Sequence, residues 1–146
     1  IGLSAYWQPS QSGWVPSIST GWGITGLSGD AQYGPVSNLN GTRIQSWYVG
    51  LQWADAFIKG NALGMAVGQT PFITQNPSAL GGTPNDGNYA WEWWYKFQVT
   101  DNISVTPALY YLSNPLGQAG WAANGRSNDS APLTNFGGII KTTFKF

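Results

Sequence analysis

The chain carries few side chains that could take part in chemistry, and two of the commonest types are missing. Six basic and six acidic residues are spread over 146 positions, and neither histidine nor cysteine is present. Histidine is the usual general base and metal ligand, and a hydrolase such as a lipase or protease needs a nucleophile beside a base. The sequence therefore predicts no enzyme, no cofactor and no metal site in this stretch, and its balanced charge disfavours nucleic acid as a partner.

One phosphate-binding motif is matched, but outside the context that its chemistry requires. Residues 21–26, GWGITG, fit the pattern G-x-G-x-x-G. A pyrophosphate would need the N-terminus of a helix directly after that motif. Residues 27–41 are instead rich in glycine, serine and asparagine, which is typical of a loop. The glycines of the motif are therefore interpreted as small residues at the end of a strand.

The pattern around the charged residues is that of β-strands rather than helices. In residues 89–99, apolar side chains alternate with Ala90, Glu92, Lys96 and Gln98. A two-residue period of this kind is the mark of a strand with two different faces. The same alternation recurs along the chain and predicts seven strands. The connections expected between them run roughly over 8–13, 26–41, 55–61, 71–87, 101–102 and 114–133.

These connections alternate between short and long, which discriminates between two all-β folds. Charged residues are only 8% of the chain and aromatic residues 15%, including nine tryptophans, so a secreted β-sandwich rich in surface aromatics and a membrane barrel both fit the composition. No run approaches 18 consecutive apolar residues, the length typical of a membrane-spanning helix. Outer-membrane barrels have short periplasmic turns and long extracellular loops, whereas a sandwich needs no such rule. The pattern favours an all-β fold, an antiparallel transmembrane β-barrel of the bacterial cell outer membrane.

Strand length and aromatic residues near the strand ends agree with a membrane barrel. Residues 89–99, tilted by about 40°, would rise roughly 25 Å, the height of a lipid-facing band. Aromatic side chains are enriched where a membrane meets water. The residues expected in such a lipid-interface aromatic girdle are Trp7, Trp14, Trp22, Trp47, Trp53, Trp91, Phe144 and Phe146.

The apolar pattern also predicts how residues 89–99 pair with the strand that follows. Apolar side chains occupy odd-numbered positions on both arms. A three-residue loop at 100–102, with Asn102 in the left-handed conformation, keeps these positions on one face. A one-residue slip would turn Lys96 toward lipid, at a cost of roughly 2–4 kcal/mol near the midplane. The expected pairs are Val99 with Ile103, Phe97 with Val105, and Trp93 with Leu109.

Side chains on the opposite face would line a water-filled lumen. Charged residues there could set the local potential and ion preference, or could be solvated wall residues without a role in selectivity. Inward aromatic rings could stack on sugars, although packing against a loop folded into the lumen is the favoured interpretation. The connection 71–87 is one loop that could form a constriction. The candidate lumen-facing residues are Glu92, Lys96, Gln98, Lys141, Lys145, Tyr48, Trp94 and Tyr110.

The C-terminus gives an orientation and a domain assignment. An alternating last strand that ends in Phe146 resembles the recognition signal of outer-membrane proteins, whose final strand descends to the periplasm. Counting back from there places the long connections and Ile1 on the extracellular side. Because Ile1 looks like part of a strand and seven strands cannot close a pore, we expect residues 1–146 to be the C-terminal part of a single barrel domain of about 14–18 strands.

Two segments resemble a known family. Residues 95–117, YKFQVTDNISVTPALYYLSNPLG, and residues 136–146, FGGIIKTTFKF, are similar to the cyanobacterial branch of the carbohydrate-selective (OprB-type) porins, often called iron-uptake porins. Members carry a signal peptide, a surface-layer-homology module that binds cell-wall polysaccharide, and then the barrel. The resemblance implies passive diffusion of small polar solutes, with inorganic ions, iron and sugars as candidates.

This resemblance also implies the partners. They are outer-membrane lipid, small polar solutes and the remaining N-terminal strands of the same barrel, with association into a homotrimer left open. The alternative function is a structural anchor that links the outer membrane to the cell wall and conducts little.

Overall fold

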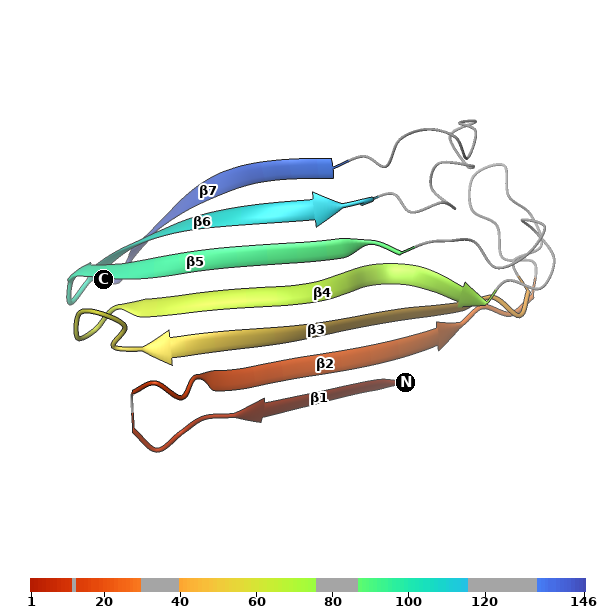
Figure 1. Ribbon diagram of the computed structural model, residues 1–146, viewed down its shortest axis with the longest axis horizontal. Coiled ribbons are helices and arrows are strands. Elements are labelled where there is room, and N and C mark those ends of the chain that lie inside the picture. Colours follow the sequence, from red (N-terminus) through yellow and green to blue (C-terminus); the bar gives the residue numbers. More distant parts are fainter. Residues whose placement is uncertain (12, 30–39, 76–86, 116–133) are drawn as a thin grey trace.

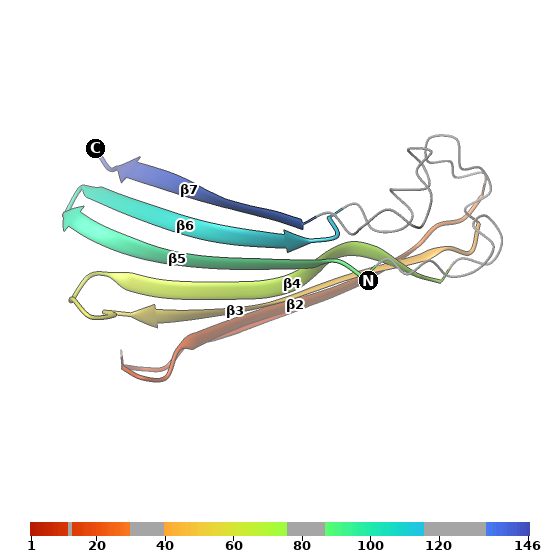
Figure 2. The same cartoon turned by 45° about the horizontal axis from the view of Figure 1, so that its top comes forward.

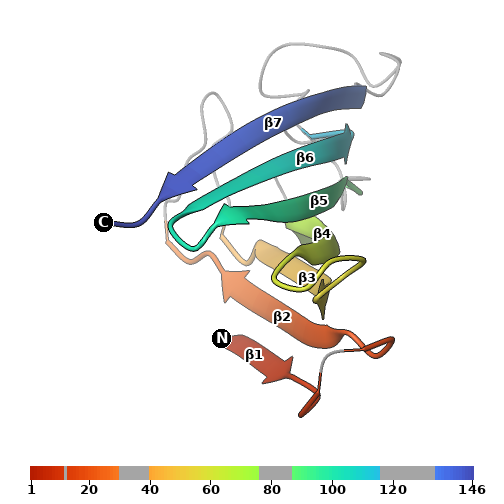
Figure 3. The ribbon, with the colours of Figure 1, turned by 90° about the vertical axis from the view of Figure 1, so that its left-hand side faces the viewer.

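The computed structural model describes residues 1–11, 13–29, 40–75, 87–115 and 134–146, which form one antiparallel sheet. Each strand pairs with the strands before and after it in the chain, in the order β1-β2-β3-β4-β5-β6-β7. Viewed along the strands, the sheet follows an arc (Figure 3). The part of the chain described here contains no helix long and apolar enough to cross a membrane. The strands are β1 (Gly2–Trp7), β2 (Ser17–Gly26), β3 (Arg43–Ala54), β4 (Ala62–Gln75), β5 (Tyr89–Thr100), β6 (Ile103–Ser113) and β7 (Thr134–Phe144).

The expected alternation of short and long connections is confirmed. Residues 27–42, 76–88 and 114–133 connect strands at one end of the sheet, which we call the loop end. Residues 8–16, 55–61 and 101–102 connect them at the other, the turn end. The N-terminus lies toward the loop end and the C-terminus at the turn end (Figures 1 and 2). The fold class is therefore as expected, with seven antiparallel strands in a single sheet.

The strand register separates the side chains into two faces of different character. Residues directly opposite in an antiparallel pair point to the same side, and successive residues along a strand point to opposite sides. Gly50, Ala66, Glu92, Tyr110 and Gly137 are linked by successive pairs, and we call their side the glycine-rich face. The other side, the apolar face, carries a similar row across all strands. That row contains Trp7, Ile18, Leu51, Met65, Trp93, Leu109 and Gly138.

The turn between β5 and β6 differs from the expected three-residue loop. Phe97 pairs with Val105, and Trp93 with Leu109, as expected, but Ile103 pairs with Thr100 instead of Val99. The turn itself is only Asp101-Asn102, and the register shifts between residues 98 and 100. This bulge adds one unpaired residue to β5, which restores the separation of faces that a two-residue turn alone would have mixed. Asn102 is also not among the residues with positive φ.

Two strand boundaries also differ from the expectation. β2 begins at Ser17, so Trp14 belongs to the connection 8–16 and not to a strand. β4 continues to Gln75, so residues 71–75 are strand, and residues 76–86 of the expected constriction loop lie outside the described part of the chain. Pro71 is tolerated because the β3–β4 register shifts beside it, and a bulge accommodates a residue without an N–H donor.

Candidate functional site

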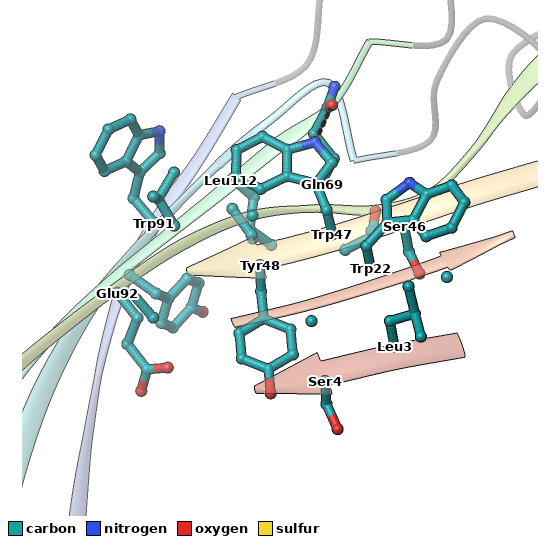
Figure 4. Close-up of a pocket in the computed structure, with 18 residues that line it drawn as sticks. Leu3, Ser4, Trp22, Ser46, Trp47, Tyr48, Gln69, Trp91, Glu92 and Leu112 are labelled. Carbon is teal, nitrogen blue, oxygen red and sulfur yellow. Dashed lines mark hydrogen bonds between the residues drawn. The ribbon is translucent and has the colours of Figure 1, made fainter. Parts of the chain in front are cut away.

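A shallow hollow of about 530 Å³ lies along the loop-end half of β1 to β6. Most residues that line it belong to the glycine-rich face, and Tyr48 and Glu92 point to the same side of the sheet (Figure 4). Part of its floor consists of small residues, namely Gly21 on β2 and Ala66 and Gly68 on β4. These small residues flank Tyr48 on β3, which pairs with Gly21 on one side and Gly68 on the other, and they leave room for its ring.

Three aromatic side chains of the glycine-rich face each lie over a glycine. Tyr48 is directly opposite Gly21, and Trp94 is directly opposite Gly64. A Cβ atom added at either glycine would overlap the facing ring. The rings therefore lie along the wall of the sheet, where they cover backbone that a glycine leaves bare.

The third pair follows the same rule, since Tyr110 is opposite Gly137 and its ring occupies the space of a Cβ there. The expected packing of Tyr48, Trp94 and Tyr110 against an infolded loop stays a prediction, because residues 76–86 lie outside the described part of the chain. The sequence contained all three glycines, but only the register reveals which aromatic residue each one faces.

Charged residues on the glycine-rich face are separated along the strands by sign. Glu92 is exposed near the loop end of β5, opposite Ala66 and Tyr110. Lys96 is half-buried four residues closer to the turn end. At about 3.3 Å per residue, roughly 13 Å of strand separates these two charges. Lys141 is exposed on β7, opposite Thr106.

The two lysines lie at one level of the sheet. Lys96 pairs with Ala62 on β4, and the β5–β6 register that joins Phe97 to Val105 brings Thr106 next to Lys96. Lys141 is the partner of Thr106 on the far side. The lysines are thus two strands apart, or about 10 Å across the sheet, and Glu92 lies on the loop-end side of both.

Gln98 and Lys145 lie at the turn end and have local hydrogen-bond partners. The Gln98 side chain donates to the Thr100 carbonyl at 2.6 Å, and its backbone N–H donates to Asn61 Oδ1 at 2.9 Å. Lys145 follows the end of β7, and its backbone N–H donates to the Asn102 carbonyl at 2.9 Å. Gln98 therefore stabilises the bulge, a role that its alternation pattern alone did not indicate.

The tryptophans expected near strand ends have hydrogen-bond partners that the sequence did not reveal. Near the loop end, Trp22 Nε1 donates to Gln45 Oε1 at 3.1 Å, and Trp47 Nε1 donates to Gln69 Oε1 at 2.6 Å. Both glutamines lie on the apolar face, because Gln45 pairs with Ile24 and Gln69 with Trp47. Their amides satisfy the indole N–H groups there.

The remaining aromatic candidates occupy both ends of the sheet. Trp91 lies near the loop end of β5 and stacks on Trp93 with ring centroids 6.0 Å apart. Trp7 is the last residue of β1, and Trp53 is next to last in β3 at the turn end. Trp14 is almost fully exposed in the connection 8–16. Phe144 ends β7, and Phe146 lies beyond it, fully exposed.

Comparison with known proteins gives a family match and two relatives. A family model described as carbohydrate-selective porin, OprB family, matches residues 2–146. An uncharacterized protein of Synechocystis sp. is 30% identical over 138 residues, which cover 92% of this chain and 23% of the relative. An uncharacterized protein of Nostoc sp. is 28% identical over 148 residues, which cover 99% of this chain and 21% of the relative. The chain thus spans less than a quarter of the length of these relatives. No solved structure matches it.

Proposed function

Because the chain belongs to the OprB family of carbohydrate-selective porins, we propose that residues 1–146 are the C-terminal part of one outer-membrane barrel domain. The barrel lets small polar solutes diffuse passively through a water-filled lumen. Inorganic ions are its simplest cargo, and iron and sugars are further candidates. Porins of this kind catalyse no reaction, so the side chains act by shape and charge alone.

The observation that carries this proposal is the difference between the two faces of a single sheet. The apolar face leaves large side chains uncovered, among them Leu109 at 52% and Ile140 at 75% exposure. An apolar surface of this extent is not stable in water and calls for lipid or another partner. The glycine-rich face instead carries Glu92, Lys96 and Lys141 above a small-residue floor, which suits contact with water.

Closure of the pore requires further strands, since an edge strand presents unpaired N–H and C=O groups. In the described sheet, β1 and β7 form the two edges. In the proposed barrel, the remaining N-terminal strands pair with both of these edges, and the closed barrel has about 14–18 strands in total. Lipid surrounds the barrel in a bacterial outer membrane, and identical barrels are candidates for association as a homotrimer.

Single-channel recording of the full-length protein in a planar lipid bilayer tests the proposed function. Diffusion through an open lumen predicts discrete current steps that increase with salt concentration. A structural anchor between the outer membrane and the cell wall would insert into the same bilayer and give no such steps. Sugar passage is measured in parallel, from the swelling rate of liposomes that contain the protein.

Replacing Lys96 with glutamate is expected to shift the ratio of cation to anion permeability toward cations. The substitution changes the local charge by two units at the level of Lys141, and the charge of a pore wall attracts ions of opposite sign. Reversal potentials under a salt gradient measure the ratio. The conservative variant Lys96→Arg is the control and should leave the ratio unchanged. An equal ratio in Lys96→Glu would make Lys96 a solvated wall residue without a role in selectivity.

A pair of single cysteines tests the orientation of the barrel. Ser28→Cys lies at the loop end and Asp101→Cys in the turn between β5 and β6, and both native side chains are exposed. Because the last strand is expected to descend to the periplasm, Ser28→Cys should react with a membrane-impermeant thiol reagent on intact cells, and Asp101→Cys only after the outer membrane is opened. The reverse labelling pattern would mean that the barrel is inserted the other way round.

A further inference from the structure

The turn end of the apolar face contains a second hollow, distinct from the proposed lumen wall. Its volume is about 580 Å³, within the range of about 300–1,000 Å³ that is usual for small-molecule sites. Trp53 and Leu63, which pair across β3 and β4, form its floor on the apolar face. Trp14 from the connection 8–16 and Phe57 from the turn 55–61 form its walls. We call this hollow the rim groove.

Both walls of the rim groove are fixed by hydrogen bonds, so the groove is preformed. The indole of Trp53 donates to the Trp14 carbonyl at 2.9 Å, which holds the connection 8–16 against β3. The Tyr95 hydroxyl donates to the Ala56 carbonyl at 2.7 Å, and the Tyr95 ring contacts Phe57 with centroids 6.0 Å apart. These two anchors come from the apolar face itself.

The conformation of Phe57 is unusual in a way that points to a ligand. Its φ is 62°, a left-handed value that a bulky residue rarely adopts. Strained backbone conformations of this kind cluster at active sites and at segments that contact ligands. Here the conformation holds the ring outward, and Phe57 is 88% exposed and Trp14 97% exposed in the chain alone. Two large apolar rings held in the open require a partner that covers them.

We propose that the rim groove binds an acyl chain of a membrane phospholipid. This inference rests on the proposed porin function, which places the apolar face against lipid and the turn end at the periplasmic leaflet. The groove continues that lipid-facing surface, since its floor residues Trp53 and Leu63 belong to it. Lys59 is exposed in the same turn as Phe57, outside the groove lining, where its positive charge attracts the phosphate of a head group. The Asp55 carboxylate lines the groove and accepts a hydrogen bond from the Gly60 N–H at 2.7 Å.

Photolabelling of the full-length protein tests the proposal. The probe is phosphatidylglycerol with a diazirine in one acyl chain, added at a low molar ratio to the purified protein in mild detergent. Labelled peptides are identified by mass spectrometry. We expect label within residues 53–63, and unlabelled phosphatidylglycerol should compete it away at concentrations that leave label around Trp93 unchanged. Free hexadecanoic acid should compete poorly, and equal competition would mean a general acyl pocket instead of a phospholipid site.

Phe57→Gly and Ile58→Gly form the matched pair of variants. Glycine adopts a positive φ without strain, so Phe57→Gly should fold at least as well as the native chain while losing one wall of the groove. Loss of an aromatic contact surface is expected to lower groove labelling about tenfold. Ile58 is also an exposed apolar residue of this turn, at 63%, but does not line the groove, so Ile58→Gly should label normally. Equal labelling of the two variants would overturn the proposal.

The same samples distinguish failure of this inference from failure of the proposed function. If label appears around Trp93 but not in residues 53–63, the apolar face meets lipid and the rim groove does not hold it. If label appears at neither place, the apolar face is not the lipid surface, and the barrel proposal fails as well. Cross-linked dimers joined through residues 53–63 would show that a second copy of the chain occupies the groove, which also overturns the phospholipid assignment.

Discussion

Replacing Gly64 with leucine is expected to lower the yield of folded barrel sharply. The ring of Trp94 fills the space that a Cβ atom at Gly64 would need. Overpacking of a well-packed site usually costs about 1–3 kcal/mol, and here the Trp94 ring must leave its place over the Gly64 backbone before a leucine can fit. The folded fraction is measured from the mobility of unboiled samples on a detergent gel, and the stability from unfolding in urea.

Two further variants make the Gly64 result specific to the contact with Trp94. Gly26→Leu is the matched control, because Gly26 is also a strand glycine but an added Cβ there meets nothing within 4 Å. It should fold like the native chain. The double variant Gly64→Leu with Trp94→Gly exchanges the large and small partners and should recover part of the lost stability, as contacting residues are coupled. No recovery would mean that Gly64 is required for another reason.

Alternation was sufficient to predict the strands and their faces. Successive side chains of a strand point to opposite faces, so a strand whose two faces meet different environments alternates between apolar and polar residues. Glu92, Trp93 and Lys96 illustrate this, since their order alone predicts which of them share a face. The register placed Glu92 and Lys96 on the glycine-rich face and Trp93 on the apolar face. The alternation of short and long connections favoured an antiparallel barrel with its long loops at one end.

The details missed by sequence analysis depend on pairing between strands, which alternation does not encode. The β5–β6 turn was assigned by assuming that every residue of both arms is paired, and the bulge near Val99 breaks that assumption. The side chain of Gln98 stabilises the bulge through bonds to Thr100 and Ile103. Trp14 fits the alternating pattern but lies outside a strand. Its backbone carbonyl accepts a hydrogen bond from the indole of Trp53.

The contacts of the glycine-rich face depend on pairing in the same way. Tyr48 could have faced any of several glycines, and only the β2–β3 register selects Gly21. Three such pairs on three different strand junctions keep the rings flat along the wall. Glu92, Lys96 and Lys141 share this face, and the charge of a pore wall attracts ions of opposite sign, so a charge is the target for a change in selectivity.

A charge placed at Trp93 is expected to reduce the folded yield by a different mechanism from the Gly64 substitution. Trp93 lies in the middle of β5 on the apolar face, between Met65 on β4 and Leu109 on β6. If this face meets hydrocarbon, Trp93→Arg transfers a guanidinium near the midplane, at a cost of roughly 2–4 kcal/mol. Folding into lipid vesicles, followed by the same gel assay, should then give much less folded protein than the native chain.

Glu92→Arg is the control for Trp93→Arg, because it introduces the same side chain one residue away on the opposite face. Glu92 is exposed on the glycine-rich face, opposite Ala66 and Tyr110. If this face lines the lumen, water solvates an arginine at this position, so the folded yield should stay near that of the native chain while ion selectivity moves toward anions. A folded Trp93→Arg together with an unfolded Glu92→Arg would show that the two faces have been exchanged. Equal folding of both variants in lipid vesicles would show that neither face is in contact with hydrocarbon, which would remove the basis for a membrane barrel.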